Sequence, residues 1–340
     1  MRQTAKQKFL VFLALPLSLV SCGPGPQGPG PQVGGGIGGT GSVKTVSSGP
    51  VTKFGSVFVS GTEYDNSNTI YCIDDEPCGP QNTLKIGMVV LVDGRISKEY
   101  SSGQPLARIA DTITYEETVE GIVQSVASDG LSLFVLGQLV RLNQKTVIDP
   151  SITGQSVHSL IPGLDLVEVS GFVTGDGEIL ATLIMKQADP PHYEIQGSVK
   201  NHDVKQKTFE IGALVVNYSS ADTSEMPSPG SATWNNIVVQ VRGDQSSQGG
   251  PGPHGAKLTA TLVKPLTLGV EDDSEAEVEG VILQVNTPGD FFVNNTHVMT
   301  TTSTIIEGGT INDLVMGAQV EIHGSLGNGV LQASHISLDD

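Results

Sequence analysis

The sequence predicts an all-β protein of tandem small five-stranded OB-like β-barrels, behind a signal peptide and a disordered tether. Three observations support this fold class. A strand pattern ending in glycine recurs four times, a second glycine pattern opens the copies, and the second copy divides into five short segments with alternating hydrophobic residues. Closure into barrels limits exposed strand edges, so it suits strands this short.

The N-terminus has the features of an export signal. Arg2, Lys6 and Lys8 precede an apolar stretch at 9–20, which is shorter than the roughly 20 residues that span a bilayer. The stretch ends in Leu-Val-Ser-Cys at 19–22, which resembles the lipobox of bacterial lipoproteins. The resemblance implies a lipoprotein signal peptide at 1–21 and a lipidated Cys22. An ordinary secretory signal with a chance cysteine is the alternative.

A spacer is expected next, at 22–48. Ten of the nineteen residues at 23–41 are glycine and four are proline, so this segment has almost nothing to bury. By analogy with Gram-negative sorting, Gly23 in place of aspartate favours the outer membrane. The periplasmic and surface faces both stay open.

The body contains four copies of one unit. The closing pattern is Val-x-[Val/Ile]-x-Gly at 90–94, 167–171, 239–243 and 320–324. The opening pattern ends in Gly121, Gly197 and Gly280, and Gly49 is the expected counterpart in the first copy. The recurring closing glycine predicts a bend or bulge in the barrel wall.

The second copy shows the strand order most clearly. Strands are expected at 119–126, 131–136, 139–142, 166–173 and 179–185, with one helical turn near 156–160. In the fourth strand Val167 and Val169 should point inward, and Glu168 and Ser170 outward. A seven-stranded sandwich is the structural alternative.

These patterns set the expected domain boundaries. The barrels are predicted at 49–115, 116–188, 189–268 and 278–340, with an acidic linker at 269–277. Units this small are marginally stable alone, so neighbouring barrels should support each other. The interruption at 245–254 corresponds to the hairpin at 175–177, and is either a contact surface at a barrel rim or a tolerated insertion.

The repeated unit resembles the bacterial domain of unknown function DUF5666, which is found repeated in exported lipoproteins. The matching residues are 54–64 with 84–94, and 119–126 with 164–185; copies three and four match more loosely. The resemblance supports the fold and the cellular address, and it implies no chemistry.

Two cysteines remain in the body. Cys72 and Cys78 are six residues apart, and in an exported chain we expect them to form a disulfide. A metal pair is the rival interpretation, but no histidine lies near them in sequence.

Carboxylates and histidines are weaker candidates for metal binding. The acidic runs Asp74–Glu76 and Glu271–Glu279 are calcium candidates, although a solvated linker explains the second run better. His297, His323 and His335 all fall in the fourth copy and could meet at a metal, or could be scattered over the surface. We therefore predict no metal site and no cofactor.

The net charge and the absence of catalytic motifs narrow the range of possible functions. The net charge of −18 argues against nucleic-acid binding. No nucleophile elbow or phosphate-binding loop is present, so we expect no enzyme. The expected function is a lipid-anchored, non-catalytic binding or scaffolding module with an envelope protein or glycan as partner. The alternatives are a ligand- or calcium-binding lipoprotein and, less favoured, an envelope hydrolase.

Overall fold

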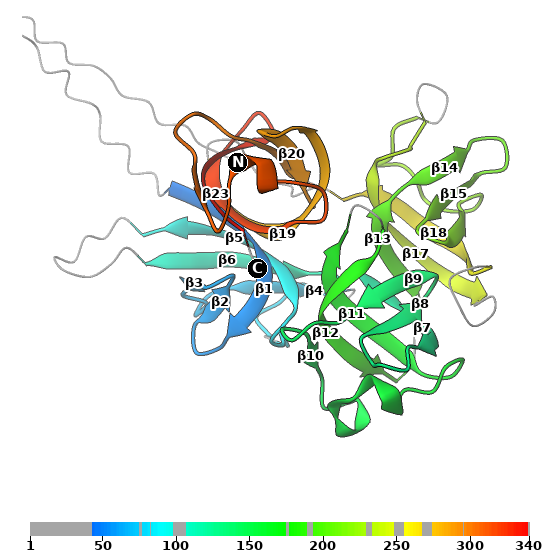
Figure 1. Ribbon diagram of the computed structural model, residues 1–340. Helices are drawn as coiled ribbons and strands as arrows, with labels where there is room; N and C mark the ends of the chain where they lie inside the picture. The colour runs from blue at the N-terminus through cyan, green and yellow to red at the C-terminus, as the bar shows by residue number, and fades with distance from the viewer. Residues whose placement is uncertain are drawn as a thin grey trace, which may run out of the picture. The chain divides into compact units, whose positions relative to one another are not determined.

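The computed structural model describes residues 43–74, 77–81, 83–97, 107–174, 177–188, 193–228, 233–247, 255–266, 274–294 and 296–338. The signal peptide, Cys22 and the Gly/Pro segment up to residue 42 lie outside this set. The described residues form an all-β protein with three short 3-10 turns (Figure 1). None of them forms a helix long and apolar enough to cross a membrane.

Each copy of the unit contributes six strands. The first has β1 (Val43–Lys53), β2 (Val57–Val59), β3 (Thr62–Tyr64), β4 (Ile70–Ile73), β5 (Val89–Ile96) and β6 (Arg108–Tyr115). The second has β7 (Val119–Val126), β8 (Ser132–Val135), β9 (Gln138–Arg141), β10 (Val147–Ile148), η1 (Thr153–Gln155), η2 (Val157–Ser159), β11 (Leu166–Val173) and β12 (Ile179–Gln187).

The fourth copy repeats this order, and the third differs from it. The third has β13 (Tyr193–Ser198), β14 (Lys200–Asp203), β15 (Thr208–Ile211), β16 (Leu214–Asn217), β17 (Val238–Ser247) and β18 (Lys257–Pro265). In the third, β14 continues β13, β15 and β16 take the places of β8 and β9, and a bridge from Asp222 to Leu262 takes the place of β10. The fourth has β19 (Glu275–Thr287), β20 (Asp290–Val293), β21 (Thr296–Met299), β22 (Ile305–Glu307), η3 (Ile311–Asp313), β23 (Gln319–Gly327) and β24 (Val330–Leu338).

Strand pairing closes two of these units into complete five-stranded barrels. The second closes as β7-β8-β9-β12-β11 and the fourth as β19-β20-β21-β24-β23, each with one parallel pair. In the first unit, the pairing between the β3 side and β6 consists of one parallel bridge, from Asp65 to Ile109. The third continues from β13 to β14 through Val199. The predicted OB-like barrels are confirmed.

The recurring glycines have two steric roles. At Gly94, Gly171, Gly243 and Gly324 the ladder shifts by one residue, and an added Cβ would clash with a carbonyl oxygen of the opposite strand. The predicted bulge is therefore present in all four copies. The opening glycines pair with the first valine of the closing pattern, and Gly49 pairs with Val90 in the same way.

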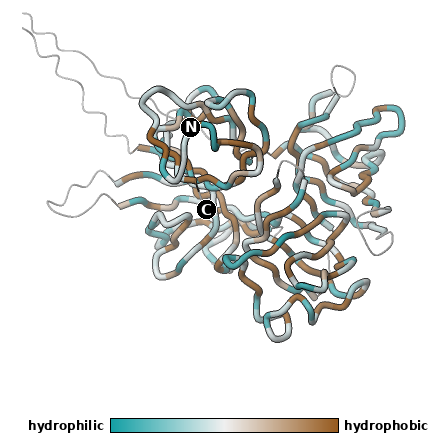
Figure 2. The backbone as a smooth tube through the Cα atoms, in the orientation of Figure 1, coloured by the Kyte–Doolittle hydropathy of each residue, from teal (hydrophilic) through white to brown (hydrophobic). Residues whose placement is uncertain are grey.

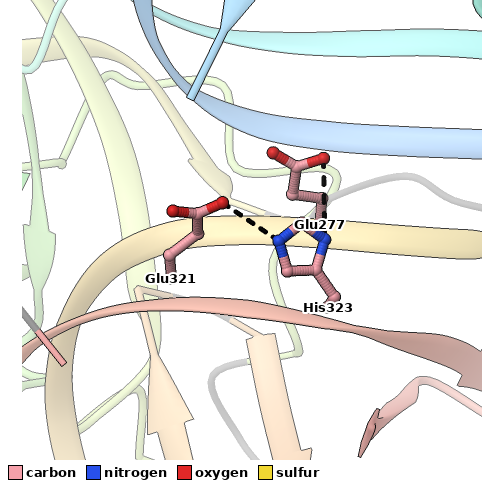
Figure 3. Close-up of side chains that lie close together, drawn as sticks. All are labelled: Glu277, Glu321 and His323. Carbon is pink, nitrogen blue, oxygen red and sulfur yellow. Dashed lines mark hydrogen bonds and ion pairs between the residues drawn. The ribbon is translucent and has the colours of Figure 1, made fainter. Parts of the chain in front are cut away.

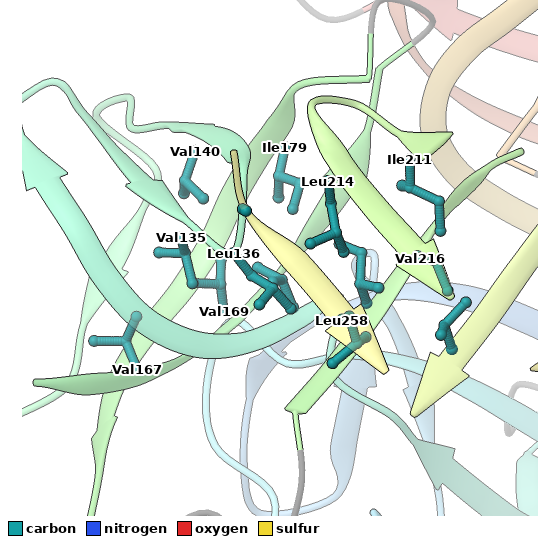
Figure 4. Packing of buried hydrophobic residues seen from close by; sticks show 14 of the residues in the cluster. Val135, Leu136, Val140, Val167, Val169, Ile179, Ile211, Leu214, Val216 and Leu258 are labelled. Atoms are coloured by element: carbon teal, nitrogen blue, oxygen red, sulfur yellow. The ribbon is translucent and has the colours of Figure 1, made fainter. Parts of the chain in front are cut away.

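Neighbouring barrels are joined directly. Strand β1 pairs in parallel with β19 of the fourth barrel, and β7 pairs antiparallel with β13 of the third. The second and third barrels share one hydrophobic core, in which Leu136, Leu214 and Leu258 lie close together (Figure 4). The first core includes Leu183 and Met185 of the second barrel, whereas the fourth barrel has its own core.

Three expected boundaries were wrong. Strand β1 begins at Val43, inside the predicted tether, and β19 begins at Glu275, inside the predicted acidic linker. Strand β17 runs to Ser247, so the first residues of the interruption at 245–254 belong to the barrel wall; residues 248–254 lie outside the described set. In each case polar residues lie in a strand because a neighbouring strand pairs with them.

The alternation along β11 was only half correct. Val167 and Val169 belong to the shared core, as predicted. Glu168 and Ser170 point away from that core, yet they are 2% and 1% exposed. The first barrel covers them, since the Val89 amide donates to Ser170 and the Tyr115 hydroxyl to Glu168. Figure 2 shows most hydrophobic residues (brown) in the strands and many of the hydrophilic residues (teal) in the turns between them.

Candidate functional site

Two carboxylates and one imidazole meet where the first barrel contacts the fourth. Glu277 on β19 lies directly across from His323 on β23, and Glu321 precedes His323 by two residues on the same face. His323 Nε2 lies 3.0 Å from Glu321 Oε1, and Nδ1 lies 3.8 Å from Glu277 Oε2 (Figure 3). One ligand atom from each residue lies within 4.8 Å of the other two.

The first barrel covers this cluster from the other side. Because β1 pairs with β19, Ser47 lies beside Glu277. The Thr62 hydroxyl donates to Glu277 Oε2 at 2.7 Å, and the Ser47 hydroxyl approaches the same oxygen at 3.5 Å. The Glu277 side chain is 2% exposed, and its Oε1 has no hydrogen-bond partner within the described part of the chain.

The electrostatics of this cluster favour a bound positive charge. Burial raises the pKa of Glu277, because a carboxylate in a dry setting loses hydration. The hydrogen bond to Glu321 raises the pKa of His323. Arg108 is the nearby permanent cation, and its Nη2 lies 3.7 Å from Glu275. Two carboxylates thus share one titratable imidazole.

The third barrel has different residues at the equivalent strand positions. Glu194 on β13 lies across from Arg242 on β17, at the position that His323 occupies in the fourth barrel. Arg242 Nε donates to Glu194 Oε2 at 2.5 Å, and Gln240, the counterpart of Glu321, donates to Oε1. In the third barrel a guanidinium and an amide thus donate to both oxygens of the carboxylate.

A row of glutamates crosses the strands that join the second and third barrels. Glu120 on β7 faces Glu168 on β11 on one side and Glu194 on β13 on the other. Burial, with the charge of Glu168, raises the pKa of Glu120 to about 8. Burial also raises the pKa of Glu168 to about 7 and that of Glu194 to about 7, and it raises that of Glu117 strongly. The row therefore holds protons near neutral pH.

Two cavities lie between barrels. One of about 400 Å³ is bounded by the first, second and fourth barrels, with Ser60, Phe172, Thr182 and Glu321 among its lining residues. A second of about 300 Å³ lies between the second, third and fourth barrels, with Lys200, Asn236, Phe292 and Asn294 in its wall. Each is large enough for a small ligand or a side chain of a partner.

The structure places the predicted cysteines together, but it does not bring the three predicted histidines to one point. Cys72 and Cys78 form the expected disulfide. His323 and His335 are cross-strand neighbours with ring centroids 6.3 Å apart. His297 lies on β21 and contacts Asp290 at 2.8 Å, beside Val330 and five residues along β24 from His335. The three histidines therefore do not converge.

The acidic runs were interpreted incorrectly in part. Glu277 lies in a buried strand and not in a solvated linker, while residues 271–273 lie outside the described ranges. Asp74 raises the pKa of Glu117, so it faces the glutamate row, and Asp75 and Glu76 also lie outside. Glu117, Glu120 and Glu321 were missed. Glu120 and Glu321 each stand at the outward position of a strand, a pattern that is also typical of a solvated face, and Glu117 lies in the connection between β6 and β7, where the sequence gives no signal.

The fold and these junctions define the chain as a tandem array of small OB-like barrels joined by strand pairing. Residues 120–185 and 279–337 match the family model of the domain of unknown function DUF5666. The two segments cover most of the second and fourth barrels, which agrees with repeats of this domain. The first barrel, expected to match closely, lies outside these segments although it shares the frame. No curated protein matches the chain.

Proposed function

We propose that this chain is an exported, lipid-anchored protein of the cell envelope whose barrels form a non-catalytic binding or scaffolding module. The observation that supports this most is the position of the two cavities. Both are lined by residues of three barrels, whereas the barrel interiors are filled by hydrophobic core residues. The tandem arrangement therefore creates recesses that a single barrel would lack.

The anchor rests on the sequence at 19–22. Lipidation of Cys22 would hold the array at a membrane, since each buried CH₂ adds about 0.8 kcal/mol. Chemistry-bearing residues at the junctions, such as Glu277 and Glu168, hydrogen-bond within the protein. A role in contact formation explains such an arrangement more simply than catalysis does.

The anchor can be tested by labelling cells with a fatty-acid analogue. The full chain should take up label and sediment with membranes, and the Cys22→Ala variant should do neither. Equal labelling of both proteins would refute lipidation at Cys22.

Partner binding can be tested by placing a photo-crosslinking residue at Lys200, in the wall of the smaller cavity. The matched position is Lys205, an exposed lysine in the turn after β14. A discrete crosslinked product from position 200 and none from position 205 would support a partner at the cavity. Equal products from both positions would argue against it.

A ligand-binding lipoprotein is the second candidate, favoured by the 400 Å³ cavity. A ligand at 100 times its Kd adds about 2.7 kcal/mol to stability. Calcium or an envelope glycan that binds there should therefore raise the melting temperature by several degrees.

A further inference from the structure

The fourth barrel differs from the third at one position in a way that points to a ligand. In the third barrel the buried Glu194 accepts a hydrogen bond from Arg242, a permanent cation, and Gln240 donates to its other oxygen. In the fourth barrel the equivalent positions hold Glu277, His323 and Glu321. The cation has been replaced by an imidazole and the amide by a second carboxylate.

This replacement makes the surroundings of Glu277 more negative than those of Glu194. Glu275, two residues before Glu277 on the same strand, adds a further carboxylate beside the cluster. Arg108 is the nearby cation, and it is paired with Glu275. Glu277 Oε1 is buried and has no hydrogen-bond partner within the described ranges, although a buried carboxylate oxygen normally has one.

We propose that Glu277, Glu321 and His323 bind a divalent transition-metal ion of the zinc type. The three ligand atoms lie within 4.8 Å of one another. Ligands at about 2.0–2.1 Å from a tetrahedral ion lie about 3.3 Å apart, so shifts of about 1 Å would complete the site. His323 and Glu321 are 39% and 33% exposed and have room to make that shift, while Thr62 holds Glu277 in place.

The ligand set favours zinc over calcium. An imidazole nitrogen suits zinc and its neighbours in the first transition row, whereas calcium takes six to eight oxygens. Three protein ligands leave a fourth coordination position open. Glu321 also lines the larger cavity, which gives the ion a path to the site and gives a further ligand a place to bind.

Bound metal would strengthen the contact between the first and fourth barrels, because Thr62 and Ser47 of the first barrel hold Glu277. The inference is independent of export and of any partner, since it concerns only these three side chains and their surroundings.

The test is a zinc titration of the untagged, purified full chain by competition with a chromophoric chelator. The wild type should bind one Zn²⁺ at this site. The double variant Glu321→Gln with His323→Arg copies the third barrel's frame, so it should fold and lose at least tenfold in affinity. His297→Ala removes a histidine paired with a single carboxylate, and it should bind as the wild type does.

Cobalt gives a second readout, since Co²⁺ held by an imidazole and two carboxylates should absorb in the visible range. That absorption should appear in the wild type and in His297→Ala and be lost in the double variant. The absence of zinc binding by the wild type would overturn the proposal. Equal binding by the double variant, or loss in His297→Ala alone, would overturn it as well.

Discussion

At the scale of single residues, each barrel has a closing glycine at which any side chain would clash with the opposite strand. The closing glycines are not held in a left-handed conformation; they are required because the opposite strand's carbonyl occupies the space of a Cβ. At the bulge, the backbones of the two strands come too close together to leave room for a side chain. Strand β23 contains both kinds of glycine, because Gly324 is crowded by the Gln332 carbonyl and Gly327 faces open space.

Gly324→Ala should therefore lower the free energy of unfolding of the fourth barrel by about 1–3 kcal/mol, the usual cost of overpacking. Gly327→Ala, in the same strand, should change it by less than about 0.5 kcal/mol. Urea unfolding of the two variants beside the wild type measures both values. Equal effects would show that the bulge does not require glycine.

The glutamate row makes stability depend on pH. The carboxyl of Glu120 has an ordinary pKa of 4.5 and a folded-state pKa of about 8. Between these values the folded chain binds more protons than the unfolded chain, so this group's contribution to stability falls as pH rises. The groups facing it are Glu117, Glu168, Glu194 and Asp74, with Arg242 and Lys85 lowering the pKa of Glu194 and Glu168 respectively.

Glu120→Gln should be nearly neutral at pH 4.5 and stabilising by about 1–2 kcal/mol at pH 8, because the amide cannot ionise. Thermal unfolding at the two pH values tests this difference. Glu225→Gln, at an exposed position, is the control and should give no pH-dependent gain. A gain for Glu120→Gln that is the same at both pH values would contradict the assignment.

At the scale of elements, the loop after β4 is held by more than its disulfide. Cys72 and Cys78 close the loop, and just outside it the backbones of Tyr71 and Gly79 exchange two hydrogen bonds of 2.7 and 2.9 Å. The chain-entropy model assigns about 2 kcal/mol to so short a loop. The two backbone bonds hold the loop in the folded state, whereas the disulfide acts by restricting the unfolded chain.

Replacement of both Cys72 and Cys78 by alanine should therefore destabilise the first barrel by about 1–2 kcal/mol. Unfolding with and without a reductant measures the effect in the wild type, and the double variant should not respond to the reductant. A response of the double variant would place the reductant's effect elsewhere in the chain.

The elements that could be predicted from the sequence are those with a clean alternation. The bounds of β7 and β11 agree with prediction at both ends. The part of β1 before Gly49 was assigned to the tether because Thr45, Ser47 and Ser48 give it the composition of a linker, although Thr45 and Ser47 are fully buried. For the same reason the cluster at Glu277 could not be predicted, since its burial comes from pairing with a strand far away in sequence.

At the scale of the whole chain, the distribution of cores predicts which parts unfold together. The second and third barrels share a core that includes Leu214, while Leu331 belongs to the separate core of the fourth. Leu214→Ala should cost about 2–5 kcal/mol and speed hydrogen exchange in both the second and third barrels. Leu331→Ala should affect the fourth barrel alone. Exchange changes confined to the third barrel in Leu214→Ala would refute the shared unit.

The pairing of β1 with β19 also has a consequence for the order of folding. Ser47 and Glu277 are neighbours in space and 230 positions apart in the chain. During synthesis from the N-terminus, the outer edge of β1 therefore waits for nearly the whole polypeptide before its neighbour arrives. Contacts this distant along the chain form slowly, and an uncovered edge can recruit other strands in the meantime. A prematurely terminated chain would keep that edge open, so completion of the last barrel also protects the first.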